Sequence, residues 1–268
     1  MRNMMLACLC LTVFVVRGTN LQPCSGAPSV FLGGSGLMTA DAFSAVNNCS
    51  RMPFVKTTTF GVSLMNMYVK DIHNLAFCTV LPTGNTAFGI KLLSSGNGVL
   101  SNTTIGAGCA HRLHQKFSFG MEIDYHVYRI NAYGSSSFIN AGFACYSEVS
   151  GKLACSFHIY NPLRTGFRKT GEKAVSVAKL GCRYKINSTV SIHTELNKSV
   201  HTSTGFSTGI RYDLSRQFYF GAGFSALQGH FTAGFGISKS GLDFACASVF
   251  GRAPGSCFNI SISYELDK

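Results

Sequence analysis

The chain has 268 residues, of which only 13% are charged, and it carries a formal net charge of +12 with 29 Gly, 22 Phe and no Trp. A soluble domain usually has about a quarter of its residues charged, so this composition argues against a protein surrounded by water alone. It also argues against a nucleic-acid partner, because the positive charge is confined to short clusters such as "RTGFRKTGEK".

The first residues, "MRNMMLACLCLTVFVVRG", place a short apolar run between Arg2 and Arg17. A helix that crosses a bilayer needs about 20 apolar residues, whereas a shorter run behind a positive charge is typical of a secretory signal. We predict a signal peptide over residues 1–20 and an exported mature chain. Elsewhere the sequence has no apolar run of membrane-helix length, so a membrane-embedded chain would have to cross as strands.

The segment 21–54 follows the signal and precedes the first strand. Its stretch "TADAFSAVNN" has apolar residues at helical spacing, with Thr39 or Asp41 able to cap the helix. We predict a short helix that plugs the interior enclosed by the strands or lies beneath it. The residues that we assign to this predicted hatch are Asp41, Ser44, Asn47 and Asn48.

From residue 55 to the C-terminus, apolar residues alternate with small or polar ones at a period of two. In "QFYFGAGFSALQGHFTAGFGISKSG", the Phe residues share one parity and most of the Gly residues share the other. About fourteen such segments occur, separated by Gly, Asn, Ser, Asp or Pro. Their length and even number predict an all-β fold, an antiparallel transmembrane β-barrel over residues 55–268, because closure leaves no unpaired backbone edge in lipid.

Turn lengths and glycine positions agree with a barrel. Connections after even strands are short, such as "PTGNT", "RLHQ" and "KSGL", and those after odd strands are longer, such as "SSGNGVLSN", "INAYGSS" and "NPLRTGFRKTGEK". The small parity should point inward, where Gly leaves room for larger groups. The glycines on this parity are Gly61, Gly89, Gly108, Gly120, Gly142, Gly181, Gly209, Gly223 and Gly236.

Ionisable residues also gather on the inward parity. Counting back from the turn at Asn187 places Arg183 opposite His193, with Glu195 diagonal to Arg183 and near Lys179. The lumen-lining candidates are Glu122, Asp124, His126, His158, Lys179, Arg183, His193, Glu195, Arg211 and Asp213. Such residues can order a ligand or filter solutes, or they can form a salt-bridged polar filling of a narrow barrel. We favour the second interpretation.

Enzymatic chemistry has little support in the sequence. It contains no GxSxG elbow and no His with an evident Ser–acid pair, so we predict no catalytic residues and no cofactor. The 11 Cys residues occur singly, without a CxxC pair, which argues against a zinc site. Several share the parity of apolar neighbours, and we interpret them as small hydrophobic residues instead of a disulfide framework.

The opening "GAPSVFLGGSG" followed by "ADAFSAVNN" resembles the start of the PorV/PorQ-type (FadL-like) outer-membrane barrels of Bacteroidota. The residues that carry the resemblance are Gly26, Ala27, Gly33, Gly34, Gly36, Ala40, Asp41, Ser44, Ala45, Asn47 and Asn48. This chain departs from the pattern at Cys49-Ser50, where the family has Pro-Ala, and in ending without a terminal aromatic residue.

The resemblance implies a location in the bacterial outer membrane, in contact with lipid and lipopolysaccharide, and a role in transport or beside type IX secretion components. Two alternatives are a passive channel for small or hydrophobic compounds and a non-conducting barrel with a structural or partner-binding role. The chain is shorter than FadL-type transporters, which implies that long substrate-holding loops are missing. The basic charge is then explained by acidic lipid headgroups or by solvated loops.

Overall fold

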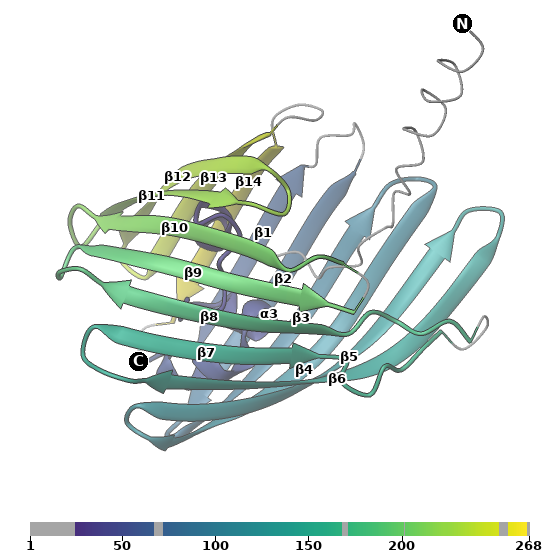
Figure 1. Cartoon of the computed structure of the whole chain (residues 1–268), viewed down its shortest axis with the longest axis horizontal. Helices are drawn as coiled ribbons and strands as arrows, with labels where there is room; N and C mark the ends of the chain where they lie inside the picture. Colours follow the sequence, from purple (N-terminus) through teal and green to yellow (C-terminus); the bar gives the residue numbers. More distant parts are fainter. Residues whose placement is uncertain (1–24, 67–71, 168–170, 201, 252–256, 267–268) are drawn as a thin grey trace, which may run out of the picture.

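The computed structural model describes residues 25–66, 72–167, 171–200, 202–251 and 257–266, so the predicted signal peptide lies outside the described residues. Fourteen strands form a closed antiparallel barrel in which each strand pairs with its neighbours in the chain and β1 pairs with β14 (Figure 1). This confirms the predicted fold class. In the described part of the chain, no helix is long and apolar enough to cross a membrane.

The strands have the following bounds: β1 (Thr59–Asn66), β2 (His73–Thr83), β3 (Thr86–Gly96), β4 (Leu100–His114), β5 (Phe117–Ile130), β6 (Gly134–Glu148), β7 (Leu153–Tyr160), β8 (Val177–Lys185), β9 (Val190–Ser199), β10 (Gly205–Asp213), β11 (Phe218–Ser225), β12 (His230–Lys239), β13 (Leu242–Gly251) and β14 (Cys257–Glu265).

The period-two pattern of the sequence becomes the two faces of the wall. On β3, Ile90 is 50% exposed on the outer face, whereas the next residue, Lys91, is 1% exposed on the inner face. The outer face carries large apolar side chains around the barrel, as a lipid-facing surface requires. Tyr184, Tyr212 and Tyr264 are exposed on this face near strand ends, where interfacial aromatic residues are expected.

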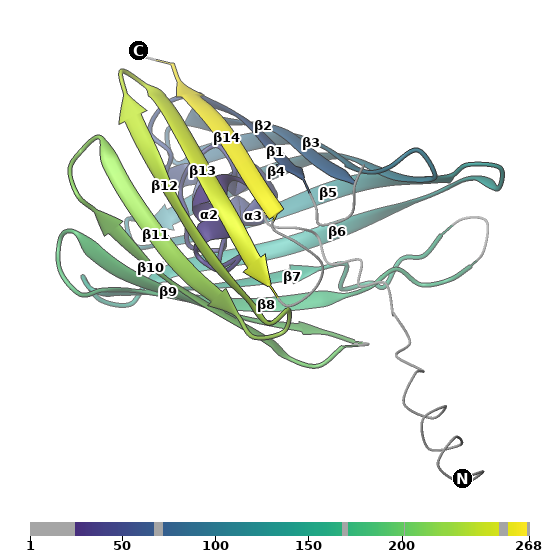
Figure 2. The same cartoon turned by 90° about the horizontal axis from the view of Figure 1, so that it is seen from above.

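The two ends of the barrel differ in their connections. One end, called here the short-turn end, has the turns at 84–85, 115–116, 149–152, 186–189, 214–217 and 240–241. The opposite end, the long-loop end, includes the segment 161–176. Two loops predicted there, "SSGNGVLSN" and "INAYGSS", are shorter than expected because the strands continue into them. β4 and β6 reach 15 residues each, and the teal strands project furthest from the barrel (Figures 1 and 2).

The described residues 25–54, called the hatch below, lie inside the barrel (Figure 2). They form α2 (Ala27–Phe31), α3 (Ser44–Asn47) and the 3-10 helix η1 (Cys49–Phe54). The predicted helix is therefore a single turn, and α2 and η1 are additional elements. Pro28 at the start of α2 was the available sequence signal, because Pro is favoured in a first helical turn.

The predicted capping of α3 by Thr39 or Asp41 is wrong. The residue before this helix is Phe43, which makes no capping hydrogen bond. The Thr39 hydroxyl instead donates to the Gly36 carbonyl at 3.0 Å, and the Asp41 backbone N–H donates to Ser44 Oγ at 3.0 Å. Both residues belong to the turns before the helix, because contacts with the barrel wall and not local propensity determine where this short helix begins.

Candidate functional site in the barrel lumen

The hatch fits the lumen because the wall beside it is made of small residues. A Cβ added at Gly209 would lie 2.5 Å from Leu32 Cα, and one added at Gly223 would lie 2.3 Å from Gly33 N. Leu32 and Phe31 are fully buried against this part of the wall. The inward glycines therefore let the backbone of the hatch approach the backbone of the barrel directly, which explains why the sequence places so many on one parity.

Buried polar side chains hold the hatch in place. Asn48 Nδ2 donates to the Leu37 carbonyl within the hatch and to Ser156 Oγ of the wall, both at 2.7 Å. Asn47 Nδ2 donates to the Ser25 carbonyl at 2.8 Å and to Ser29 Oγ at 3.1 Å. The predicted hatch residues Asn47 and Asn48 thus fix the loops of the hatch, and Asn48 also ties it to β7.

Side chains of the wall reach the hatch backbone as well. The Thr232 hydroxyl donates to the Phe31 carbonyl at 2.7 Å and accepts from the Gly33 N–H at 3.0 Å. Glu195 accepts from the Leu37 N–H at 3.2 Å. The predicted lumen residue Glu195 therefore contacts the hatch directly, in addition to the Lys179 ammonium at 3.7 Å that sequence spacing anticipated.

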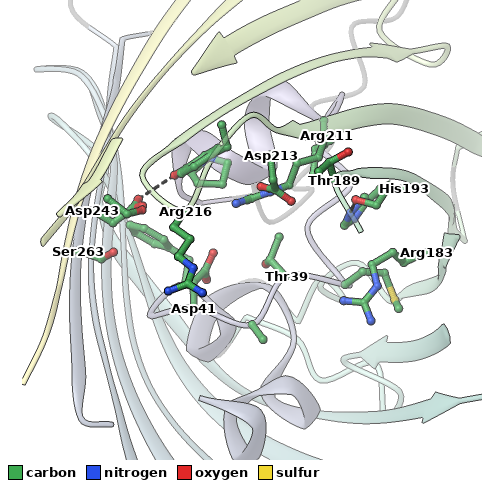
Figure 3. A pocket seen from close by; sticks show the side chains of 18 of the residues that line it. Thr39, Asp41, Arg183, Thr189, His193, Arg211, Asp213, Arg216, Asp243 and Ser263 are labelled. Atoms are coloured by element: carbon green, nitrogen blue, oxygen red, sulfur yellow. Dashed lines mark hydrogen bonds and ion pairs between the residues drawn. The ribbon is translucent and has the colours of Figure 1, made fainter. Parts of the chain in front are cut away.

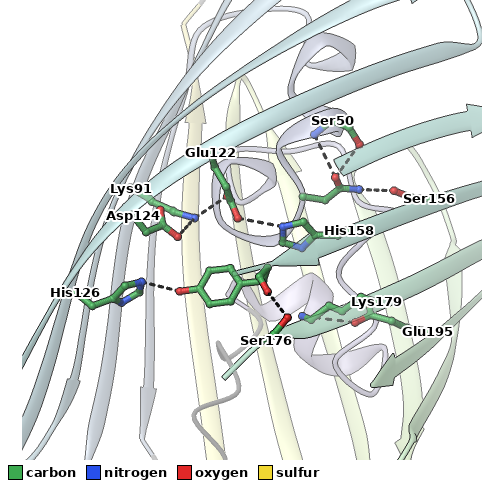
Figure 4. Close-up of polar contacts among 12 residues, drawn as sticks. Ser50, Lys91, Glu122, Asp124, His126, Ser156, His158, Ser176, Lys179 and Glu195 are labelled. Atoms are coloured by element: carbon green, nitrogen blue, oxygen red, sulfur yellow. Dashed lines mark hydrogen bonds and ion pairs between the residues drawn. The ribbon is translucent and has the colours of Figure 1, made fainter. Parts of the chain in front are cut away.

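A buried ion cluster occupies the lumen on the long-loop side of the hatch (Figure 4). Lys91 Nζ lies 2.7 Å from Glu122 Oε2 and 3.0 Å from Asp124 Oδ2, and His158 Nε2 lies 3.1 Å from Glu122 Oε1. All four side chains are almost fully buried. The prediction did not include Lys91, although it shares the inward parity of Gly89. This cluster matches the salt-bridged filling that we favoured.

An aromatic group lies beyond this cluster, toward the long-loop end. His126 Nε2 is 2.6 Å from the Tyr160 hydroxyl, and the His126 ring stacks on Phe138 with a centroid distance of 4.6 Å. The ring centroids of Phe138 and Phe167 are 4.9 Å apart, and the Tyr128 ring packs against both. The predicted lumen residue His126 is therefore part of an inward-facing aromatic cluster that the sequence pattern did not reveal.

The remaining predicted lumen residues lie on the short-turn side of the hatch, around a cavity of about 810 Å³. Figure 3 shows Arg183 and His193 on one side of this cavity and Asp41 and Asp243 on the other. Arg183 lies directly opposite His193, as predicted. Arg211 Nε is 2.8 Å from Asp213 Oδ1, so these two predicted residues form an ion pair within β10.

The hatch contributes two ionisable side chains to this cavity. Burial raises the pKa of Asp41 from 3.8 to about 6, with a further contribution from the nearby Asp243 carboxylate. Burial also lowers the pKa of Arg51 from 12.5 to about 10. The guanidinium carbon of Arg51 lies over the Tyr146 ring at 3.9 Å from its centroid and 4.7 Å from the centroid of the Phe54 ring. Arg51 was not predicted as a lumen residue because the motif around it gave no sign of an inward position.

The predicted residues thus separate into two compartments with the hatch between them. On β5, Ser118 donates to the Ser50 carbonyl of the hatch, and Glu122 and Asp124 follow toward the long-loop end. On β9, Glu195 contacts the hatch and His193 lies on its short-turn side. Any solute that crossed the lumen would have to pass the hatch, an ion cluster on one side and the cavity on the other.

No protein-family model and no curated protein sequence matches this chain. Solved structures do match it. The TodX deltaS2S3 mutant, a monoaromatic hydrocarbon channel, superposes with a TM-score of 0.70 at 12% identity and covers 91% of this chain and 99% of its own. The Pseudomonas putida toluene transporter TodX superposes with a TM-score of 0.63 at 12% identity, and the match covers 89% of this chain and 97% of the transporter. A Pseudomonas aeruginosa FadL homologue superposes with a TM-score of 0.60 at 10% identity, and the match covers 92% of this chain and 98% of the homologue.

These similarities show the class of fold: a closed, FadL/TodX-like β-barrel of 14 strands with short helical pieces at its N-terminus. The FadL-like part of the resemblance seen in the sequence is therefore confirmed at the level of the fold. The finer relation to PorV/PorQ-type barrels stays a prediction.

Proposed function

We propose that the protein is a transport barrel of the bacterial outer membrane, closed by the hatch and opened to small compounds when the hatch moves. One observation carries the proposal: the hatch fills the lumen without joining the sheet. Within the described residues, it contacts the wall only by packing and by hydrogen bonds that involve side chains. Such a segment can leave its position without breaking the barrel. The predicted signal peptide and the apolar outer face support the location.

The long-loop side of the lumen favours small uncharged or apolar solutes over ions. On the long-loop side, a solute meets the rings of Tyr128, Phe138 and Phe167 before it reaches the ion cluster. Aromatic rings offer favourable contacts to apolar and aromatic compounds. Lys91 lies between the two carboxylates of the cluster, so an entering anion would lose its hydration without gaining a free cationic partner there. The similar TodX structures, a monoaromatic hydrocarbon channel and a toluene transporter, agree with this preference.

A second candidate is a non-conducting barrel that binds a protein partner, such as a type IX secretion component. The density of the hatch packing favours it. Phe31, Leu32 and Cys49 have no exposed surface, and several glycines of the wall are in contact with the hatch backbone. Displacing a plug that is packed this closely costs free energy. A barrel with a purely structural role would never have to displace it.

Single-channel conductance of the refolded protein in a planar bilayer separates the two candidates. The full chain is compared with a variant that lacks residues 21–52, and heat-modifiable migration in gels verifies that both form barrels. Conductance steps that appear or grow on deletion support a plugged conduit. Silence in both folded proteins, without uptake of toluene by vesicles that contain either of them, contradicts the transport proposal and directs the search to a protein partner. Uptake of toluene into vesicles that contain the full chain then tests the preference for apolar solutes.

A further inference from the structure

The cavity at the short-turn end contains two neighbouring arginines that lack a carboxylate partner. Arg51, in η1 of the hatch, has its guanidinium carbon 3.9 Å from the centroid of the Tyr146 ring. Arg183, on β8, reaches the Tyr146 hydroxyl with Nη2 at 3.5 Å. Among the described residues, neither arginine lies within ion-pair distance of a carboxylate. Two like charges around one ring, in a partly desolvated position, repel each other unless an anion lies between them.

The nitrogen atoms that face this region also lack hydrogen-bond partners. Arg51 is only 4% exposed, yet its Nε and Nη1 donate to no described residue. The same holds for Arg183 Nε and for Nδ1 of the buried His193, which lies directly opposite Arg183. Buried polar atoms are nearly always paired, and a guanidinium can only donate. The two guanidinium groups that line this cavity therefore need an acceptor that the described chain does not supply, and the unpaired His193 nitrogen lies on the same cavity.

The carboxylates of the cavity are engaged elsewhere. Asp213 is paired with Arg211 at 2.8 Å. Asp243 accepts hydrogen bonds from the Tyr219 hydroxyl at 2.8 Å and from Ser238. Asp41 lies on the same side of the cavity as Asp243 (Figure 3) and is disfavoured in its charged form by burial and by the Asp243 carboxylate. The Arg51 and Arg183 charges thus keep their attraction for an external anion.

The entrance to the cavity adds positive charge. Lys185, Arg216 and Lys239 line it at strand ends and a turn of the short-turn end, where the carboxylates are Glu265 and Asp213, the latter paired with Arg211. A rim of one predominant charge draws ions of the opposite sign toward the cavity. Ala40, which is exposed, also lines the cavity, so the cavity has some apolar surface for the body of a solute.

We propose that Arg51, Arg183 and His193 form a binding site for an oxyanion, the carboxylate or phosphate group of a small solute that enters from the short-turn end. The planar guanidinium groups suit the two oxygen atoms of such a group. Because Arg51 belongs to the hatch and Arg183 to the wall, a bound oxyanion joins the two and holds the hatch in its closed position. The site goes beyond the proposed transport function and does not depend on it, since a non-conducting barrel would bind the oxyanion equally.

Isothermal titration calorimetry of the full refolded chain in detergent at low salt tests this site. The probes are sodium benzoate, for a carboxylate on an apolar body, and inorganic phosphate. We expect saturable binding of at least one probe, weakened about tenfold or more in Arg183→Gln and by added salt, since charge-assisted hydrogen bonds are lost or screened. Binding of benzoate alone identifies a carboxylate site, and binding of phosphate alone identifies a phosphate site.

Two further variants make the test specific. Lys152→Gln removes an equal charge from an exposed turn at the same end but outside the cavity, so its affinity should match that of the unaltered protein. Arg51→Gln should weaken binding as Arg183→Gln does. The proposal is overturned if the folded protein binds neither probe saturably, or if Arg183→Gln and Lys152→Gln bind with equal affinity. Heat-modifiable migration confirms a folded barrel for every variant.

Discussion

Replacing Gly223 by Ala should loosen the N-terminal part of the hatch. The added methyl carbon would lie 2.3 Å from Gly33 N and 2.5 Å from the carbonyl carbon of Leu32. Both contacts are with backbone atoms, so no change of rotamer can relieve them and the hatch must shift as a whole. Overpacking of this kind costs about 1–3 kcal/mol. At about 1.4 kcal/mol per factor of ten, the population with a displaced hatch should increase by about 5- to 150-fold.

Limited proteolysis measures this displacement. Phe31 has no exposed surface in the closed hatch, so chymotrypsin can cut after it only when this part of the hatch leaves the wall. When opening and closing are fast relative to cleavage, the rate follows the open population. Gly108→Ala is the matched control, because its methyl would meet nothing nearer than 3.4 Å. Equal cleavage rates for the two variants, both with folded barrels, would refute the argument that inward glycines are there to admit the hatch backbone.

Three further predictions follow from the buried polar groups and the strand register. The pKa of Asp41 is raised to about 6 in the closed hatch, so closure is most favourable below the ordinary value of 3.8 and weakens as the pH rises through 6. Amide hydrogen exchange of the hatch, corrected for intrinsic rates, should show about tenfold less protection at pH 8 than at pH 5, and Asp41→Asn should abolish the difference. Lys91→Met leaves the buried Asp124 without a cationic partner and Glu122 with His158 alone, and it should destabilise the barrel by about 3–5 kcal/mol in urea unfolding. The exposed Lys116→Met should not, and equal midpoints for the two variants would contradict the role of the ion cluster. Cys155 and Cys182 face each other across β7 and β8, with their sulfur atoms 3.1 Å apart. Copper phenanthroline should therefore oxidise the two thiols to one disulfide, with loss of two protons and two electrons to the oxidant. If peptide mapping finds no cross-link between these two residues, the register of β7 and β8 is wrong.

The barrel was predictable because the information that specifies it is local. Each strand shows its own period of two, so the outward Ile90 and the inward Gly89 could be assigned without knowing which strands pair. The cross-strand position of Arg183 and His193 was predictable for the same reason, since a short turn fixes the register between its flanking strands. Lys91 could also have been assigned to the lumen from its parity alone.

The hatch was less predictable because its conformation depends on what surrounds it. α3 is a single turn, too short to be stable by itself, and its position follows from packing against the wall. Arg51 points into the cavity because η1 turns the chain there, and a 3-10 helix with Pro53 inside has no strong sequence signature. The pairing of Cys155 with Cys182 required the register across the long segment 161–176, which no local pattern supplies.

The attachments of the hatch determine which part of it can open first. η1 continues through residues 55–58 into β1, and the Asn48 amide ties its start to Ser156 of the wall. α2 has no such covalent link to the sheet within the described residues. It is held by Thr232, by Ser261 Oγ, which accepts from the Ala27 N–H at 3.0 Å, and by close contact with the glycine face. A partial opening should therefore release α2 and leave η1 in place. In Gly223→Ala, chymotrypsin should then cut after Phe31 while trypsin still fails to cut after Arg51. Because Arg51 stays beside Arg183 in this state, the proposed oxyanion site would remain formed while the lumen next to α2 opens.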